Sequence, residues 1–138
     1  MIEFTIPGEP VAQGRPRAST RNGKVRMYDP AKSKNYKTFV QLVARQHAPK
    51  KPLEGAVSMT VKIYRPMLKG FSMKRRNEAE AGLYRPITKP DNSNYLKGIE
   101  DALNGVIYHD DSQIVTSKVE KYYSYNPRVE IRVEEVIP

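Results

Sequence analysis

The amino-acid sequence predicts an α/β chain of the α+β kind, in which a mixed β-sheet packs with helices in a single domain over residues 1–138. Segments in which apolar and polar residues alternate are interleaved with segments in which apolar residues recur at helical spacing. Two long alternating segments follow one another at the end of the chain, a pattern typical of an antiparallel hairpin. The length of 138 residues suits one hydrophobic core.

The N-terminal part is predicted to contain a strand, a hairpin and a helix. Residues 2–6 alternate between apolar and polar side chains, as expected of a half-buried strand. Asn22-Gly23 is a strong signal for a hairpin turn, with residues 24–28 as the returning strand. Asp29-Pro30 has the residue types of a helix N-cap and first helical position, so we expect a helix from there to about Gln46.

The remaining elements follow from the same two periods. Residues 55–65 form the clearest strand, because every second residue from Val57 to Ile63 is apolar. We interpret residues 66–90 as a mobile basic insertion with a short helix over 74–80. The predicted elements that follow are a helix over 91–104 closed by Gly105, a brief extended segment over 106–108, and two strands over 114–123 and 128–136.

The charge balance favours a polyanionic partner. Twenty-four Lys and Arg against fifteen Asp and Glu give a formal net charge of +9, and such a chain binds phosphates by releasing their counterions. A basic protein without a nucleic-acid partner and one that meets acidic lipid are the alternatives. The chain has no Cys, which excludes disulfides and thiolate metal ligands. No segment has the pattern of a signal peptide or a membrane span, so we expect an intracellular protein.

Acidic residues gather around the predicted helix at 91–104. Asp91 stands at its start, and Lys97 lies on one of its faces together with Asp101. Asp110-Asp111 follows the brief extended segment and places two adjacent negative charges in a chain whose net charge is positive. Carboxylates are the ligands that Mg²⁺ prefers, so Asp91, Asp110 and Asp111 are candidate metal ligands. If the bound ion promotes cleavage of a phosphodiester, Lys97 is a candidate to hold the reacting phosphate or to stabilise the negative charge that develops on it.

Each of these residues also has an ordinary interpretation. Asp91 has the residue type and position of a simple helix cap, and Asp-Asp followed by Ser is a common turn composition. A lone lysine such as Lys97 is more often a solvated surface charge. Glu100 falls away from the Lys97 face, and we expect it to face solvent.

Basic residues form two groups along the chain. The first group lies on or beside a loop rich in Gly and Pro, where Arg side chains can follow a phosphate backbone, and consists of Arg15, Arg17, Arg21, Lys24 and Arg26. The second group precedes the acidic helix and consists of Lys69, Lys74, Arg75, Arg76, Arg85 and Lys89. We expect both groups to contact the phosphate backbone of a nucleic acid without reading bases. The alternative for the first group is a solvated loop.

The motifs of the acidic region, in this order, resemble the signature of the RusA family of Holliday junction resolvases. That signature has an Asp-x-Asp-Asn helix start, a Lys one turn on, Asp-Ala-Leu, and then Asp-Asp-x-Gln before a hydrophobic residue. The matching residues here are Lys89-Pro90-Asp91, Asn94, Lys97, Asp101-Ala102-Leu103-Asn104-Gly105 and Asp110-Asp111-Ser112-Gln113-Ile114. Weaker support comes from the opening strand with its Gly- and Pro-containing loop and from the two closing strands.

The resemblance implies an endonuclease that acts in DNA recombination and repair in the cytoplasm, in association with the nucleoid. It implies a homodimer that binds four-way junctions and nicks two strands with Mg²⁺, with Mn²⁺ as an alternative ion. Carried over by position, Asp91 and Asp111 are the catalytic carboxylates and Lys97 is the functional lysine. Asp110 lies beside the site and shares or tunes it.

One position departs from the family pattern. Ser93 stands where the family has the second Asp of its helix start, so the site loses a charge. The open outcomes are a variant that recruits Asp110, a weakened nuclease, or a junction-binding module without cleavage, and an engineered substitution is a further alternative. We expect activity to survive, because Asp91, Asp110 and Asp111 still supply three carboxylates. A basic RNA-binding domain ranks last, because the usual aromatic signatures of such modules are missing.

Overall fold

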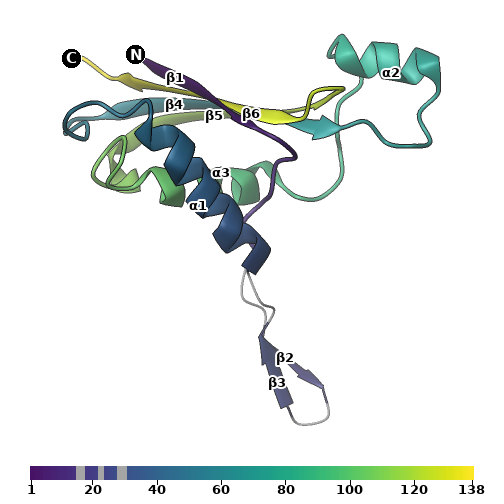
Figure 1. The fold of residues 1–138 in the computed structure, drawn as a ribbon, viewed down its shortest axis with the longest axis horizontal. Helices are drawn as coiled ribbons and strands as arrows, with labels where there is room; N and C mark the ends of the chain where they lie inside the picture. The colour runs from purple at the N-terminus through teal and green to yellow at the C-terminus, as the bar shows by residue number, and fades with distance from the viewer. Residues whose placement is uncertain (15–17, 22–23, 28–30) are drawn as a thin grey trace.

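Alternating apolar residues build a four-stranded mixed sheet at the centre of the computed structural model (Figure 1). The structure describes residues 1–14, 18–21, 24–27 and 31–138. The strands of the sheet are β1 (Ile2–Pro7), β4 (Val57–Pro66), β5 (Ile114–Ser124) and β6 (Arg128–Glu135), in the spatial order β1-β6-β4-β5. β4 runs parallel to β5 and antiparallel to β6, which confirms the predicted mixed sheet in an α+β domain.

The expected hairpin between the last two strands is wrong, because β4 lies between β5 and β6. Val61 in β4 faces Val119 of β5 on one side and Ile131 of β6 on the other. β4 takes the interior position because its alternating residues Val57, Met59, Val61 and Ile63 are all fully buried. Because β4 and β5 are parallel, both start at the same edge of the sheet, so the residues that precede β4 lie beside those that precede β5.

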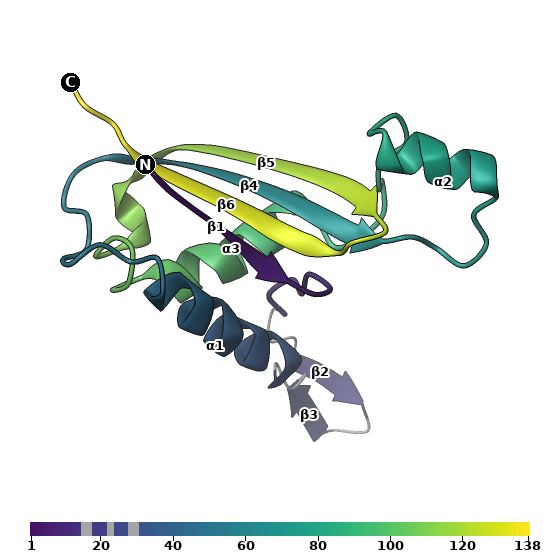
Figure 2. The same ribbon diagram turned by 45° about the horizontal axis from the view of Figure 1, so that its top comes forward.

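Two helices cover one face of the sheet (Figure 2). They are α1 (Ala31–Arg45) and α3 (Asn92–Leu103), and both agree with the sequence prediction within two residues at each end. α3 buries Tyr95, Ile99, Ala102 and Leu103 against the sheet, where they join the core formed by the four strands. No helix within the described ranges is long and apolar enough to cross a membrane.

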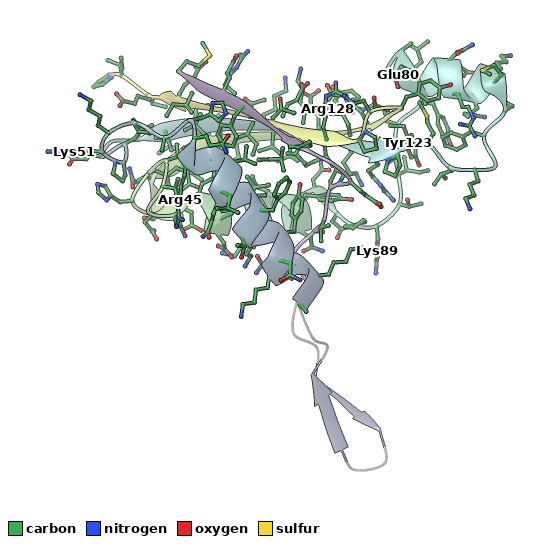
Figure 3. All side chains as sticks on the ribbon, in the orientation of Figure 1. Arg45, Lys51, Glu80, Lys89, Tyr123 and Arg128 are labelled. Carbon is green, nitrogen blue, oxygen red and sulfur yellow. The ribbon has the colours of Figure 1, made fainter. Side chains whose placement is uncertain are left out.

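A lobe formed by residues 67–87 projects beyond one end of the sheet and contains the short helix α2 (Met73–Glu80), which confirms the helix predicted over 74–80. The lobe has a small aromatic core in which Phe71 packs edge-on against Tyr84 and Tyr123. Glu80 accepts hydrogen bonds from Ser124 Oγ (3.1 Å) and from the backbone N–H of Tyr125 (2.9 Å). Glu80 and Tyr123 lie at the same end of the molecule in Figure 3. The insertion is therefore docked onto the end of β5; its predicted mobility stays untested.

The chain reverses direction after α3, so the brief extended segment expected over 106–108 is wrong. Gly105 has a φ of 74°, which favours glycine, and its N–H donates to the carbonyl of Tyr108 (2.7 Å). The N–H of Ile107 donates to the carbonyl of Leu103 (3.1 Å). This turn buries Ile107 and Tyr108 completely. Burial of two apolar side chains explains the apolar run that resembled a strand in the sequence.

The predicted N-terminal hairpin is present as a separate two-stranded sheet. β2 (Ala18–Arg21) pairs antiparallel with β3 (Lys24–Met27), and Arg21 is opposite Lys24. The Asn22-Gly23 turn and the Asp29-Pro30 helix start lie outside the described residues.

The buried face of β4 should determine much of the stability. Val61→Thr places a hydroxyl in a fully buried site and should lower the free energy of unfolding by about 1–3 kcal/mol. The same substitution at Val115, which is 61% exposed on β5, should change it by less than about 0.5 kcal/mol. Urea denaturation of both variants measures the difference. Equal effects at the two positions would contradict the assigned burial.

Candidate active site

The start of α3 is held by side chains from the sheet. Arg65 Nη1 on β4 donates to the carbonyl of Thr88 (3.3 Å). Lys121 Nζ on β5 donates to the carbonyls of Thr88 and Pro90 (3.1 Å each). Burial lowers the pKa of Lys121, and the nearby charge of Arg65 lowers it further. Two cations from neighbouring strands therefore hold the backbone immediately ahead of the helix.

Asp91 occupies the N-cap position of α3, as predicted, but its carboxylate does not cap the helix. The backbone carbonyl of Asp91 accepts from the N–H groups of Asn94 (3.1 Å) and Tyr95 (3.3 Å). The side chain makes no capping hydrogen bond to the described residues and is exposed. The negative charge of Asp91 acts on the nearby Lys121 ammonium and opposes the lowering of its pKa by burial. The carboxylate is therefore accessible at the helix N-terminus, where a negative charge is favourable.

Further along α3, one lysine lies between two carboxylates. Lys97 Nζ is 3.2 Å from Asp101 Oδ1 and 3.6 Å from Asp111 Oδ2. Lys37 Nζ from α1 is 3.3 Å from the other oxygen of Asp101. The hydrogen bond to Asp101 raises the pKa of Lys97, and the charges of Asp101 and Asp111 add to this effect. These ion pairs form a charge cluster in which positive and negative side chains alternate. The cluster connects α1, α3 and the loop after α3.

The loop that carries Asp111 is fixed by Gln113. A short 3-10 helix, η1 (Asp111–Gln113), links the turn after α3 to β5. Gln113 Oε1 accepts from the backbone N–H groups of His109 (2.8 Å) and Asp110 (2.9 Å). Gln113 Nε2 donates to the carbonyls of Leu53 (2.8 Å) and Gly55 (2.9 Å), which precede β4. One amide side chain thus ties the acidic loop to the neighbouring strand start.

Asp110 has the turn role that its residue type allows. Its Oδ2 accepts from the backbone N–H of Ser112 (2.9 Å), completing a capping box with Gln113. Hydrogen bonds from Ser112 hold the pKa of Asp110 below its usual value. The side chain is exposed. Asp110 therefore stabilises η1, and its share in metal binding stays a prediction.

The structure brings some of the predicted site residues together and leaves others apart. Asp111 meets α3 at Lys97 and Asp101, whereas Asp91 lies at the start of the helix, about 9 Å along its axis from Lys97. Over residues 1–14, 18–21, 24–27 and 31–138, no three or more His, Cys, Asp and Glu side chains are grouped so that they could hold a metal ion. The proposed ligand set of Asp91, Asp110 and Asp111 stays a prediction.

Sequence reasoning missed three contributions to this region. Lys37 lies 64 residues from Asp101, and no local pattern indicated that the two would meet. Gln113 was recognised only as part of a motif. Glu100, which we expected to face solvent, is half-buried, and its pKa is raised first by burial and then by the charge of Asp111.

The basic residues of the lobe are engaged in different ways. Arg75 lies over the Tyr84 ring (3.9 Å to its centroid), and Arg76 Nε donates to the carbonyl of Phe71 (3.2 Å). Lys89 is exposed on the segment that leads into α3 (Figure 3).

Of the first basic group, Arg21 on β2 and Lys24 on β3 are paired in the register of the hairpin. Arg15 and Arg17 lie outside the described residues. DNA contacts by either group stay predictions.

The fold and the site thus define a small basic α+β protein with a mixed sheet and a helix that carries Lys97 opposite the acidic loop. The family model described as "Endodeoxyribonuclease RusA" matches residues 7–134, so this chain belongs to the RusA endodeoxyribonuclease family. The resemblance found in the acidic motifs is thereby confirmed, and the chain is an endonuclease by family. "Uncharacterized protein YqaN" of Bacillus subtilis (strain 168) is 61% identical over 137 residues, which cover 98% of this chain and 96% of that protein.

Removing the Gln113 amide should loosen the acidic loop. Gln113→Ala leaves two N–H groups and two carbonyls without their partner and should lower the free energy of unfolding by about 2 kcal/mol. The matched control is Gln46→Ala, at an exposed glutamine just after α1, which should change it by less than about 0.5 kcal/mol. Urea denaturation compares the two. A control effect as large as that of Gln113→Ala would refute a special role for this amide.

Proposed function

We propose that this protein is a Mg²⁺-dependent endonuclease that resolves Holliday junctions by paired nicks in DNA recombination and repair. The observation that carries the proposal is the contact between Lys97 and Asp111, two parts of the family motif that are distant in sequence and meet at 3.6 Å. A net charge of +9 supports a phosphate-rich substrate. We also propose that it works in the cytoplasm, on nucleoid DNA.

The donor chemistry at this site suits a hard divalent cation. Asp101 and Asp111 both face one positive group, the Lys97 ammonium, and carboxylate oxygens are preferred ligands of Mg²⁺. We propose that Asp111 and Asp110 hold the ion at this end of α3, and that the free carboxylate of Asp91 contributes to the site. When bound, Mg²⁺ polarises a phosphodiester and lowers the pKa of a water molecule.

The protein's own side chains supply the remaining chemistry. Lys97 is proposed to stabilise the negative charge that develops on the scissile phosphate. Arg65 and Lys121 keep the Asp91 backbone in place through the Thr88 and Pro90 carbonyls. Gln113 keeps the acidic loop in place through the hydrogen bonds of its side-chain amide. These contacts orient the reacting groups before DNA arrives, which lowers the cost of organising them in the transition state.

Partner contacts are proposed on the same basis. A two-fold dimer would place two active sites on a four-way junction of matching symmetry. Backbone contacts are proposed for Arg15, Arg17, Arg21, Lys24, Arg75, Arg76 and Lys89. Lys89 is the strongest candidate in the second basic group, because it is exposed and lies two residues before Asp91. Arg75 and Arg76 already hold the lobe together, so their share in binding is secondary.

The test of this function is cleavage of a synthetic four-way junction with and without Mg²⁺, alongside a linear duplex of the same length. The wild-type protein should nick the junction only with Mg²⁺. Asp111→Asn should lower the cleavage rate at least about 100-fold while junction affinity is retained, because a charged ligand becomes neutral. Glu135→Gln, at an exposed carboxylate at the end of β6, is the matched control. Unchanged cleavage by Asp111→Asn would remove the basis of the proposal.

A second candidate function is junction binding without cleavage. It is favoured by Ser93, which replaces a family carboxylate, and by the lack of a three-ligand acidic group in the described part of the chain. Ser93, Lys97 and Asp101 are spaced by four residues, so they share one face of α3. A carboxylate at position 93 would stand one turn from Lys97.

Ser93→Asp separates the two candidates. If the wild-type protein is an impaired nuclease, the variant should cleave the junction at least about tenfold faster, because it restores a metal-binding carboxylate, with unchanged affinity. Ser117→Asp, at an exposed position on β5, adds the same charge away from the site and should have no such effect. Cleavage by the variant alone would identify the natural chain as a binding protein. Equal acceleration by both substitutions would contradict a local role for position 93.

A further inference from the structure

The charge cluster at the end of α3 has an arrangement that the family motif alone does not explain. Lys97 contacts Asp101 one turn along the same helix and Asp111 on a different segment. The side chains of the two aspartates are 26% and 25% exposed, so each is partly in contact with water. Two carboxylates that face one point repel each other, and a positive group between them relieves this repulsion. In the free protein that group is the Lys97 ammonium.

A divalent ion on Asp111 would compete with this ammonium. Both are cations that favour the same carboxylate oxygen, and like charges at contact distance repel each other. An ion on Asp111 would therefore favour a Lys97 side chain that has turned away from this carboxylate. The shorter contact, 3.2 Å to Asp101, does not depend on Asp111.

Asp101 is itself fixed from a second helix. Its Oδ2 is 3.3 Å from Lys37 Nζ on α1, while its Oδ1 is 3.2 Å from Lys97. The carboxylate is thus oriented by Lys37 and presents its other oxygen to Lys97. Such a bridged carboxylate is suited to retain a lysine whose other partner has been taken.

We propose that Lys97 is the resident cation of Asp111 in the metal-free protein, that Lys97 and a divalent metal ion bind Asp111 in competition, and that Asp101 keeps the displaced lysine at the site. This inference rests on the proposed metal-dependent function. Asp101 is then a positioning residue that acts through Lys97. The exchange makes Lys97 available to a DNA phosphate only after the metal ion has bound.

The test is Mn²⁺ binding to the full chain without DNA, measured by titration calorimetry. Lys97→Met should bind Mn²⁺ at least about fivefold more tightly than the wild-type protein, because a competing positive charge is removed. Lys37→Met is the matched control: it removes the same charge from the same Asp101 but does not vacate the position beside Asp111. Its affinity should stay within about twofold of the wild-type value, because only a more distant charge is lost.

The outcomes separate this inference from the proposed function. If Lys97→Met binds Mn²⁺ no more tightly than Lys37→Met does, the proposed competition is overturned. The proposed function, metal-dependent junction cleavage, is not affected by that result. Asp111→Asn should abolish binding; if it does not, the metal site lies elsewhere and both proposals fail. Lys97 is 55% exposed, so its replacement should leave the fold intact. Lys97→Gln is a second variant that should show the same tightening.

The role of Asp101 has its own readout. At saturating Mg²⁺, Asp101→Asn should lower the kcat of junction cleavage about tenfold with little change in KM, because the retained lysine acts on the reacting phosphate. Asp101→Glu, which keeps the charge, should restore most of the lost rate. A normal kcat in Asp101→Asn, or a failure of Asp101→Glu to restore it, would overturn the assignment of Asp101 as the residue that retains Lys97.

Discussion

Burial of one face of α3 against the sheet fixes the position of the charged residues that this helix carries in the candidate site. Tyr95, Ile99, Ala102 and Leu103 are almost fully buried, so the helix has no freedom to rotate about its axis. The opposite face therefore always presents Lys97 and Asp101 toward α1 and the acidic loop. The charged contacts are individually weak in partly exposed surroundings. They have a defined geometry because the apolar face of the helix sets it.

Most local structure could be predicted from the sequence, because periodicity reports which face of a segment is buried. The strands at 57–66 and 114–124 and the helix at 92–103 were found within a few residues of their observed ends. The order of strands could not be predicted, because insertion of β4 between β5 and β6 depends on contacts far apart in sequence. The apolar residues at 106–108 were wrongly predicted to be extended for a related reason. Apolar residues are buried both in strands and in some turns, so their composition does not distinguish the two.

The candidate site shows the same division between local and distant information. Lys97 and Asp111 belong to a dense motif, and the structure brings them together. The turn role of Asp110 could also be predicted, because an acidic pair followed by Ser is typical of a turn. The contact between Lys37 and Asp101 could not be predicted, because the two residues are 64 positions apart in the sequence. The link from Gln113 to the residues before β4 follows only from the parallel pairing of β4 and β5, which no sequence pattern indicated.

The hydrogen bond between Arg65 and Thr88 closes the lobe of residues 67–87 at its base. The two residues are 23 positions apart, yet the sheet holds both, so the chain between them leaves and returns at nearly the same point. Closing such an excursion costs free energy that grows only slowly with its length. Related chains should therefore tolerate a longer, shorter or exchanged lobe while Asp91 stays where it is. The lobe is accordingly the part of this fold whose length and sequence can change without rebuilding the acidic helix.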